Sequence, residues 1–171
     1  MKLKSFGFAV LSGAFAVSAF AQTQVSGTLK CNGASGTSHT VEVGDHPGHV
    51  LMINKDKDDS CTWPVPIEIA GVKTKGNSGA GFTEVNGRTF QVRDWDVTTM
   101  ENGDKVYVHS QTMGTMAEDG KAFTYVGTWS WIGGTGRFKG IKGKGTFKGS
   151  GNLDSGATSQ IEGAYTLPGA S

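Results

Sequence analysis

The chain has 171 residues and a formal net charge of +1, with 27 glycines, 4 prolines and 2 cysteines. This length fits one domain, and the near-neutral charge excludes the strongly basic profile of a nucleic-acid-binding protein. The glycine content and the short spacing of the turn signals favour an all-β protein.

The first 21 residues have the features of a secretory signal peptide. Lys2 and Lys4 make a positive start, residues 5–20 are mainly apolar, and residues 19–21 (Ala-Phe-Ala) form a small-x-small cleavage pattern. The apolar run is shorter than the roughly 20 residues of a membrane-spanning helix, so no lasting anchor is expected. We predict a periplasmic or secreted protein with residues 22–171 as one mature domain. Loss of the two lysines leaves 14 basic against 15 acidic residues, a net charge of −1.

Both cysteines, Cys31 and Cys61, lie in the mature chain. In an oxidising compartment a pair of this kind forms a disulfide, which here would close a loop near the N-terminus. By the chain-entropy estimate, a crosslinked loop of about 30 residues is worth roughly 3.5 kcal/mol of folding free energy. A free, reactive thiol is the alternative.

Short alternating segments between turn signals predict eight to ten antiparallel strands. The expected strands lie at residues 25–31, 39–43, 50–54, 67–73, 82–85, 89–98, 106–109, 121–132 and 160–167. We predict a single antiparallel eight-stranded barrel, lipocalin-like in shape, because closure removes exposed sheet edges and leaves room for side chains or one small ligand. A two-sheet sandwich is the competing arrangement.

The segment Asp-His-Pro-Gly-His at residues 45–49 collects groups that can bind metals. His39 precedes it and an aspartate-rich run, residues 56–59, follows. Imidazole with carboxylate suits zinc or copper, but no HExxH or paired CxxC spacing fixes the geometry. The segment is also typical of a solvated turn, and residues 56–59 lack the glycine and final glutamate of an EF-hand. We therefore predict no bound metal and no cofactor.

A row of polar side chains marks the segment that begins at Val106. Tyr107, His109 and Gln111 share one strand face, and His109 would titrate near neutral pH as a general acid or base. This makes Tyr107 and His109 candidate ligand-binding residues. However, Val106 and Val108 occupy the opposite face, and the simpler assignment puts these valines inside and the polar row in water.

Aromatic residues dominate one face of residues 121–132. Tyr125, Trp129 and Trp131 fall on the same side as Phe123 and alternate with polar residues. Aromatic walls with a few polar groups are typical of small-molecule pockets. Tyr125, Trp129 and Trp131 are therefore candidate ligand-binding residues. The alternative is that the rings simply fill the centre of a small barrel.

Glycines are densest from residue 133 to residue 151. Gly143-Lys144 is followed by Gly145 instead of Ser or Thr, so the segment is not a P-loop, and no helix follows to make a dinucleotide site. Glycines in strands mark bends, bulges and positions where a large ring packs on the backbone. We expect the covering rings to be Trp129, Trp131, Phe138 and Phe147.

The segment WIGGTGRFKGIKGKGTF, residues 131–147, resembles the glycine-rich strand pair of the allene oxide cyclase and dirigent barrel superfamily. The resemblance is good over residues 120–149 and elsewhere rests on strand number and length. It implies an eight-stranded barrel with an apolar cavity, assembled as a homodimer or homotrimer. In that superfamily, proteins hold reactive, mostly apolar substrates in a productive conformation, which asks little of acid-base groups. The acidic, Arg and Tyr residues used there align by motif with no position of this chain.

These patterns predict an exported barrel that binds a small apolar molecule in its interior. One alternative is a cofactor-independent isomerase or cyclase of an unsaturated lipid or polyketide-like substrate, and another is a structural or surface interaction protein with a solid barrel. A cavity without ionisable side chains would favour the binding protein. An inward Glu, Asp or His near the aromatic face would favour the enzyme.

Overall fold

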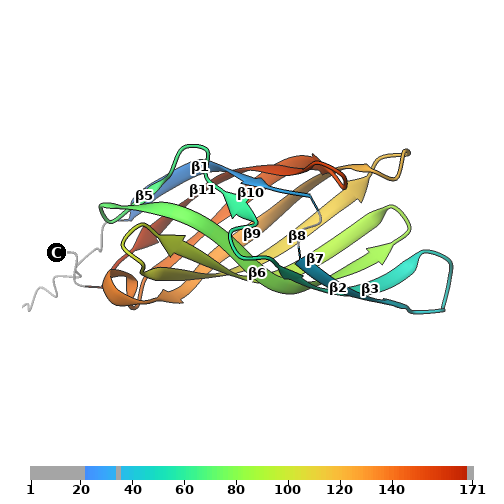
Figure 1. The fold of residues 1–171 in the computed structure, drawn as a ribbon, viewed down its shortest axis with the longest axis horizontal. Helices are drawn as coiled ribbons and strands as arrows, with labels where there is room; N and C mark the ends of the chain where they lie inside the picture. Colours follow the sequence, from blue (N-terminus) through green and yellow to red (C-terminus); the bar gives the residue numbers. More distant parts are fainter. Residues whose placement is uncertain (1–21, 34–35, 169–171) are drawn as a thin grey trace, which may run out of the picture.

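The computed structural model describes residues 22–33 and 36–168, which are almost entirely β-structure (Figure 1). The signal peptide predicted for residues 1–21 lies outside the described residues. None of the helical segments in the described ranges has the length and hydrophobicity that a membrane crossing requires. The elements are β1 (Thr23–Cys31), β2 (Gly36–Glu42), β3 (His49–Asp56), β4 (Cys61–Thr62), β5 (Glu68–Ile69), β6 (Val72–Asn86), β7 (Thr89–Met100), β8 (Lys105–Met116), β9 (Ala122–Gly134), the 3-10 helix η1 (Gly136–Phe138), β10 (Lys142–Asn152) and β11 (Gly156–Thr166).

Eight of these strands close into an antiparallel barrel. Around the barrel the hydrogen-bonded order is β1, β11, β10, β9, β8, β7, β6 and β4, and β4 pairs again with β1. The hairpin β2–β3 extends the sheet beyond β6, and β5 pairs with the start of β6. The predicted all-β barrel is confirmed, and the two-sheet sandwich is not the arrangement that forms.

The barrel closes between β1 and β6 through the two-residue strand β4. This strand pairs with the end of β1 on one side and with Gly76 and Asn77 of β6 on the other. Cys31 of β1 and Cys61 of β4 lie directly across from each other and form a disulfide. The predicted disulfide is confirmed, and it crosslinks the strands at the point where the sheet closes.

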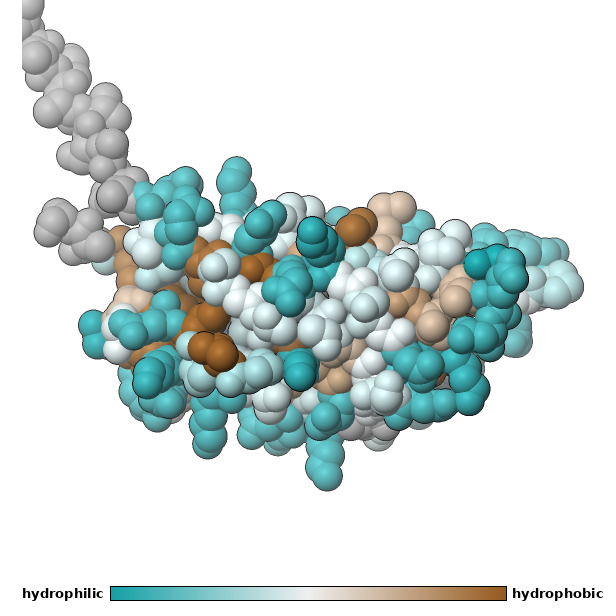
Figure 2. Space-filling view, turned by 90° about the horizontal axis from the view of Figure 1, so that it is seen from above, coloured by the Kyte–Doolittle hydropathy of each residue, from teal (hydrophilic) through white to brown (hydrophobic). Residues whose placement is uncertain are grey.

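One end of the barrel is solid. Side chains from β5, β7, β8, η1 and the residue before β10 meet there and are almost completely buried: Ile69, Met100, Val106, Phe138 and Ile141. This is the end at which β1 begins and β11 ends (Figure 1). Figure 2 shows hydrophobic residues gathered toward this end and mainly hydrophilic residues at the other. Burial of these five side chains therefore plugs the barrel at one end.

Glycines of β10 lie opposite aromatic rings of β9. A Cβ atom at Gly145 would lie 2.7 Å from Cε2 of Trp129, closer than real Cβ atoms approach. Phe147 reverses the pattern and covers Gly127 of β9. The rings thus lie against bare backbone, as expected from the sequence. The register gives four such pairs: Gly143 with Trp131, Gly145 with Trp129, Gly149 with Tyr125 and Gly151 with Phe123.

We expect Gly145→Ala to destabilise the fold by about 2 kcal/mol, because the added methyl group must displace the Trp129 ring or the β11 backbone. Lys144→Ala changes the neighbouring, exposed position on β10 and should stay within about 0.5 kcal/mol of wild type. Urea unfolding followed by circular dichroism measures both. Equal stabilities of the two variants would show that the ring is not held against this glycine.

Candidate ligand-binding cavity

The other part of the barrel interior is hollow. A cavity of about 560 Å³ lies between the buried plug and the loops next to the disulfide. Small-molecule sites typically have volumes of about 300–1,000 Å³. The exposed residues Thr37, Lys55 and Leu153 belong to its lining, so the cavity reaches the surface at this end. The barrel interior is therefore filled by side chains at one end and open to a ligand over the rest.

Strand β9 supplies an aromatic wall of this cavity. Phe123, Tyr125, Trp129 and Trp131 all line it, so the three residues singled out on this face of the sequence point inward. Trp129 and Trp131 are buried, with ring centroids 5.1 Å apart. The Trp129 indole N–H donates a hydrogen bond to the carbonyl oxygen of Glu162, at 3.2 Å. This bond and the glycines beneath the ring fix the wall in place.

The hydroxyl group of Tyr125 adds a polar point to the aromatic wall. It lies 2.7 Å from Oγ of Ser159 on β11, and either hydroxyl can be the donor. Burial raises the pKa of Tyr125, so its phenol stays protonated at neutral pH. A hydroxyl group has one donor and two acceptor positions, so this pair can still hydrogen-bond a ligand.

Three aspartates form a second wall. Asp94 and Asp96 lie on one face of β7, and Asp56 is the last residue of β3; all three line the cavity. Their neighbours on β6 leave room for them: a Cβ atom at Gly79 would collide with the Asp96 carboxyl group, and one at Gly81 with that of Asp94. The glycines of β6 therefore allow two carboxyl groups to turn into the barrel.

Burial raises the pKa of all three carboxyl groups, and nearby negative charge adds to the effect for two of them. The pKa of Asp96 is raised to about 8, by burial first and then by the charges of Asp94 and Asp56, against a hydrogen bond from Asn77. That of Asp94 is raised to about 6, by burial and then by Asp56. Among the described residues that line the cavity, Lys55 is the single cation, and no ion pair involves these aspartates. At neutral pH the carboxyl group of Asp96 is thus mainly protonated and can donate a hydrogen bond, whereas that of Asp94 is mainly ionised and accepts hydrogen bonds.

We expect the free energy of unfolding to decrease as the pH rises from about 4 to about 8. A carboxyl group with a raised pKa binds its proton more tightly in the folded chain than in the unfolded chain, so losing this proton destabilises the fold. Asp96→Asn stays neutral and keeps the shape. It should be more stable than wild type by about 2 kcal/mol at pH 8.5, less than the full shift implies because the side chain faces a wet cavity. The advantage should shrink at pH 5.

Chemical denaturation at both pH values measures this difference, with the exposed Asp58→Asn as a control. A stability difference between wild type and Asp96→Asn that stays constant from pH 5 to pH 8.5 would contradict the raised pKa.

Two residues singled out in the sequence, Tyr107 and His109, lie on the outer face of β8 and do not line the cavity. Val106 is fully buried and Val108 lines the interior, so the valines take the inner face. The His109 ring packs on Trp95, with ring centroids 5.0 Å apart. The assignment with the polar row outside is the one observed, which removes Tyr107 and His109 from the pocket.

The inward aspartates were not found from the sequence. In the segment Arg-Asp-Trp-Asp-Val, residues 93–97, the rule that apolar side chains face inward puts Trp95 and Val97 inside. The structure has the reverse, with Trp95 50% exposed. The available signal was the pair of glycines, Gly79 and Gly81, which the register sets across from Asp96 and Asp94.

Comparison with known proteins found similar chains among the solved structures. No protein-family model and no curated protein matches the chain. Among solved structures, the pterocarpan synthase dirigent protein PsPTS1 is 12% identical, with a TM-score of 0.46, covering 86% of this chain and 96% of that one. The pterocarpan synthase dirigent protein GePTS1 is 13% identical, with a TM-score of 0.47, covering 92% and 98%. The eight-stranded antiparallel barrel that the glycine-rich segment led us to expect is shown by the strand pairing of the chain itself.

Proposed function

We propose that this protein binds a small, mostly apolar molecule inside its barrel. The observation that carries the proposal is the cavity of about 560 Å³, with aromatic rings on one wall and carboxyl groups on another. Burial of apolar ligand surface supplies affinity at about 25 cal/mol per Å². The few polar groups, the Tyr125 hydroxyl and the carboxyls of Asp94 and Asp96, would then fix the orientation of the ligand. A solid structural barrel is less well supported, because the interior is open over part of its length.

The charge of the cavity narrows the class of ligand. A ligand carboxylate would meet the ionised Asp94 in poorly solvated surroundings. Of the described lining residues, Lys55 at the exposed rim is the one cation that could offset the repulsion. A neutral molecule with hydroxyl or carbonyl groups, or one with a positive charge, avoids this repulsion. We therefore favour a neutral or cationic ligand over a free fatty acid.

A second candidate, a cofactor-independent isomerase or cyclase, is favoured by the inward aspartates beside the aromatic wall. With its pKa near 8, Asp96 can give a proton to a carbonyl or leaving oxygen, while the ionised Asp94 takes one from a hydroxyl group. One proton is given and one is taken, so ring closure or a double-bond shift needs no further reactant. The aromatic wall would hold the reacting ends of the substrate together.

Binding is tested with the neutral fluorescent probe N-phenyl-1-naphthylamine, whose emission rises in apolar surroundings. We expect wild type to bind it in the barrel and Thr112→Phe, which places a ring in the cavity, to bind it at least tenfold more weakly. Trp95→Ala removes an aromatic ring from the outer face and should leave the affinity unchanged. A folded Thr112→Phe variant with the affinity of wild type would place the probe outside the cavity.

The two candidates are separated by native mass spectrometry of the protein purified from cells, compared with its denatured mass. A small molecule that is retained and lost on denaturation identifies a ligand. That compound is then incubated with wild type and with Asp96→Asn. A binding protein returns the compound unchanged, whereas an enzyme converts it to an isomer of the same mass and loses most of that rate in Asp96→Asn.

We further propose that the mature protein works outside the cytoplasm. Residues 1–21 have the signal pattern, and the Cys31–Cys61 disulfide is of the kind that persists in oxidising compartments. We expect the protein from a periplasmic or medium fraction to begin at Gln22 and to weigh two hydrogens less than its reduced form. A chain that keeps Met1 and stays in the cytoplasm would contradict export. Assembly as a homodimer or homotrimer stays a prediction.

A further inference from the structure

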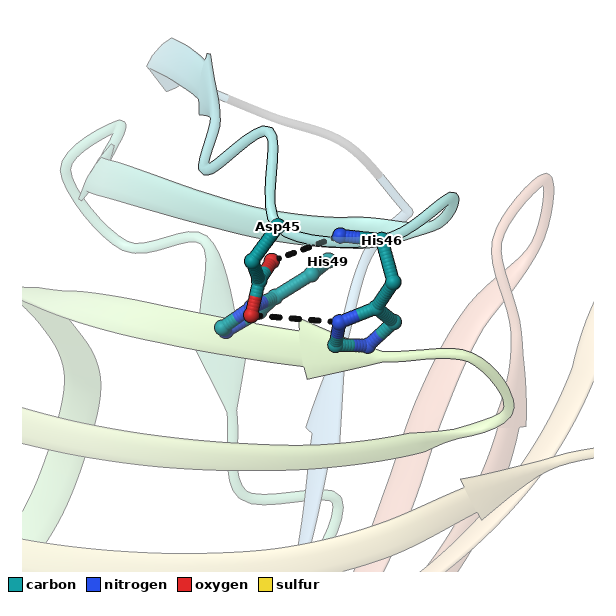
Figure 3. A group of neighbouring side chains, drawn as sticks. All are labelled: Asp45, His46 and His49. Carbon is teal, nitrogen blue, oxygen red and sulfur yellow. Dashed lines mark hydrogen bonds and ion pairs between the residues drawn. The ribbon is translucent and has the colours of Figure 1, made fainter.

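Asp45 and His46 of the turn between β2 and β3 and His49 at the start of β3 bring two imidazoles and a carboxylate together (Figure 3). None of the three lines the cavity. The ligand atoms of Asp45, His46 and His49 all lie within 4.8 Å of one another. Nδ1 of His46 lies 3.1 Å from Oδ2 of Asp45, and Nδ1 of His49 lies 2.8 Å from Oδ1. The carboxylate thus lies between two imidazole nitrogens of the same type.

Each imidazole is also held through its other nitrogen. Nε2 of His49 lies 3.1 Å from Oε1 of Glu84, and Nε2 of His46 lies 3.1 Å from Oδ1 of Asn86. Both of these oxygens only accept hydrogen bonds, so Nε2 carries a hydrogen. The Asp45 oxygens beside Nδ1 are acceptors too, so an ion bound at Nδ1 would replace the proton there while Nε2 keeps its own. Metal-binding histidines almost always have such an oxygen behind the ring, because it fixes the tautomer and raises the basicity of the ligand nitrogen.

The backbone holds this cluster between two neighbouring hairpin turns. The Val43 N–H donates to the carbonyl oxygen of His49 at 3.0 Å, which closes the β2–β3 turn. The Gly87 N–H of the β6–β7 turn donates to the carbonyl oxygen of Gly48 at 3.1 Å. Gly48 has a φ of +79°, which glycine adopts without strain. Glu84 and Asn86 lie at the end of β6, so both turns contribute to one site.

We propose that Asp45, His46 and His49 bind a divalent transition-metal ion, Zn²⁺ in the first place, with water as a fourth ligand. Two imidazoles and one carboxylate are a donor set suited to zinc. Each Nδ1 lies 2.8 or 3.1 Å from one of the two Asp45 oxygens, and the ligand atoms all lie within 4.8 Å of one another. Small side-chain movements would bring them to the edge of about 3.4 Å of a tetrahedron with bonds of about 2.1 Å. The proposal departs from the expectation of no metal drawn from the sequence, in which Glu84 and Asn86 stand 35 and 40 residues away from the rings that they support.

The bound ion would tie the β2–β3 hairpin to the barrel. Within the described residues, β2 pairs with β3 alone, and β3 joins the rest of the sheet through β6. An ion held by the turn, with its ligands supported from β6, adds a link at the far end of this hairpin. Zinc should therefore raise the melting temperature, and the rise should grow with the logarithm of the zinc concentration relative to the dissociation constant.

The test is calorimetric titration of untagged mature protein with ZnCl₂ in a buffer that does not chelate metals. We expect one ion per chain with a dissociation constant on the order of micromolar or lower, and visible absorption bands of bound Co²⁺ in a parallel titration. His49→Gln and Asp45→Asn each remove a ligand and should weaken binding by a factor of 100 or more. Glu84→Gln alters only the supporting acceptor and should weaken it by about 10 to 100-fold.

The matched control is His39→Gln, an exposed histidine on β2 that lies across from Ile53 and outside the cluster. Its zinc affinity should equal that of wild type. Lack of binding at one ion per chain would overturn the proposal and leave the cluster as an ion pair between Asp45 and the histidines. Zinc binding that His49→Gln and Asp45→Asn both retain in the folded state would place the ion elsewhere and overturn it equally.

Discussion

The packing of β9 rings against bare β10 backbone sets the shape of the barrel interior. A ring that lies along the wall over a glycine does not reach across the centre, so a barrel rich in large side chains can still be hollow. Trp129 shows this best, because its ring covers Gly145 of β10 and Gly163 of β11, which pair with each other. Toward the end that holds the plug, Phe138 and Ile141 are completely buried and no longer belong to the lining of the cavity.

The wall formed by Asp94 and Asp96 also depends on room left by glycines of the neighbouring strand. Gly79 and Gly81 leave room beside β7, and Asp96 and Asp94 occupy it. An acid in this position is costly when ionised, and the protein carries it as a neutral group at the pH where most carboxyl groups are charged. A proton donor, Asp96, and a proton acceptor, Asp94, therefore lie two residues apart on β7. Neither forms an ion pair with another of the described residues.

Local signals in the sequence were sufficient for the fold, but not for the whole site. The turn signals, the glycine-ring pattern and the cysteine pair predicted the barrel, the disulfide and the aromatic wall of Tyr125, Trp129 and Trp131. Alternation says which residues share a strand face, but only the rest of the fold decides which face is inside. For β7 the apolar-inside rule chose the wrong face, because Trp95 covers the outside. The cluster around His49 depends on β6 residues that no local spacing connects to it.

The barrel closes through β4, which lies between β1 and β6, and the stability of this closure (the seam) depends on oxidation of the two thiols. Strand β4 offers two residue pairs to each neighbour, whereas β9 and β10 share ten. A chain with free thiols has only this short ladder and side-chain packing to hold the seam, so its wall can part there more easily than anywhere else around the barrel. Oxidation of Cys31 and Cys61 removes that weak point. The disulfide therefore locks the closure of the barrel. In a chain that has not yet been oxidised, β1 and β4 can still separate along their length.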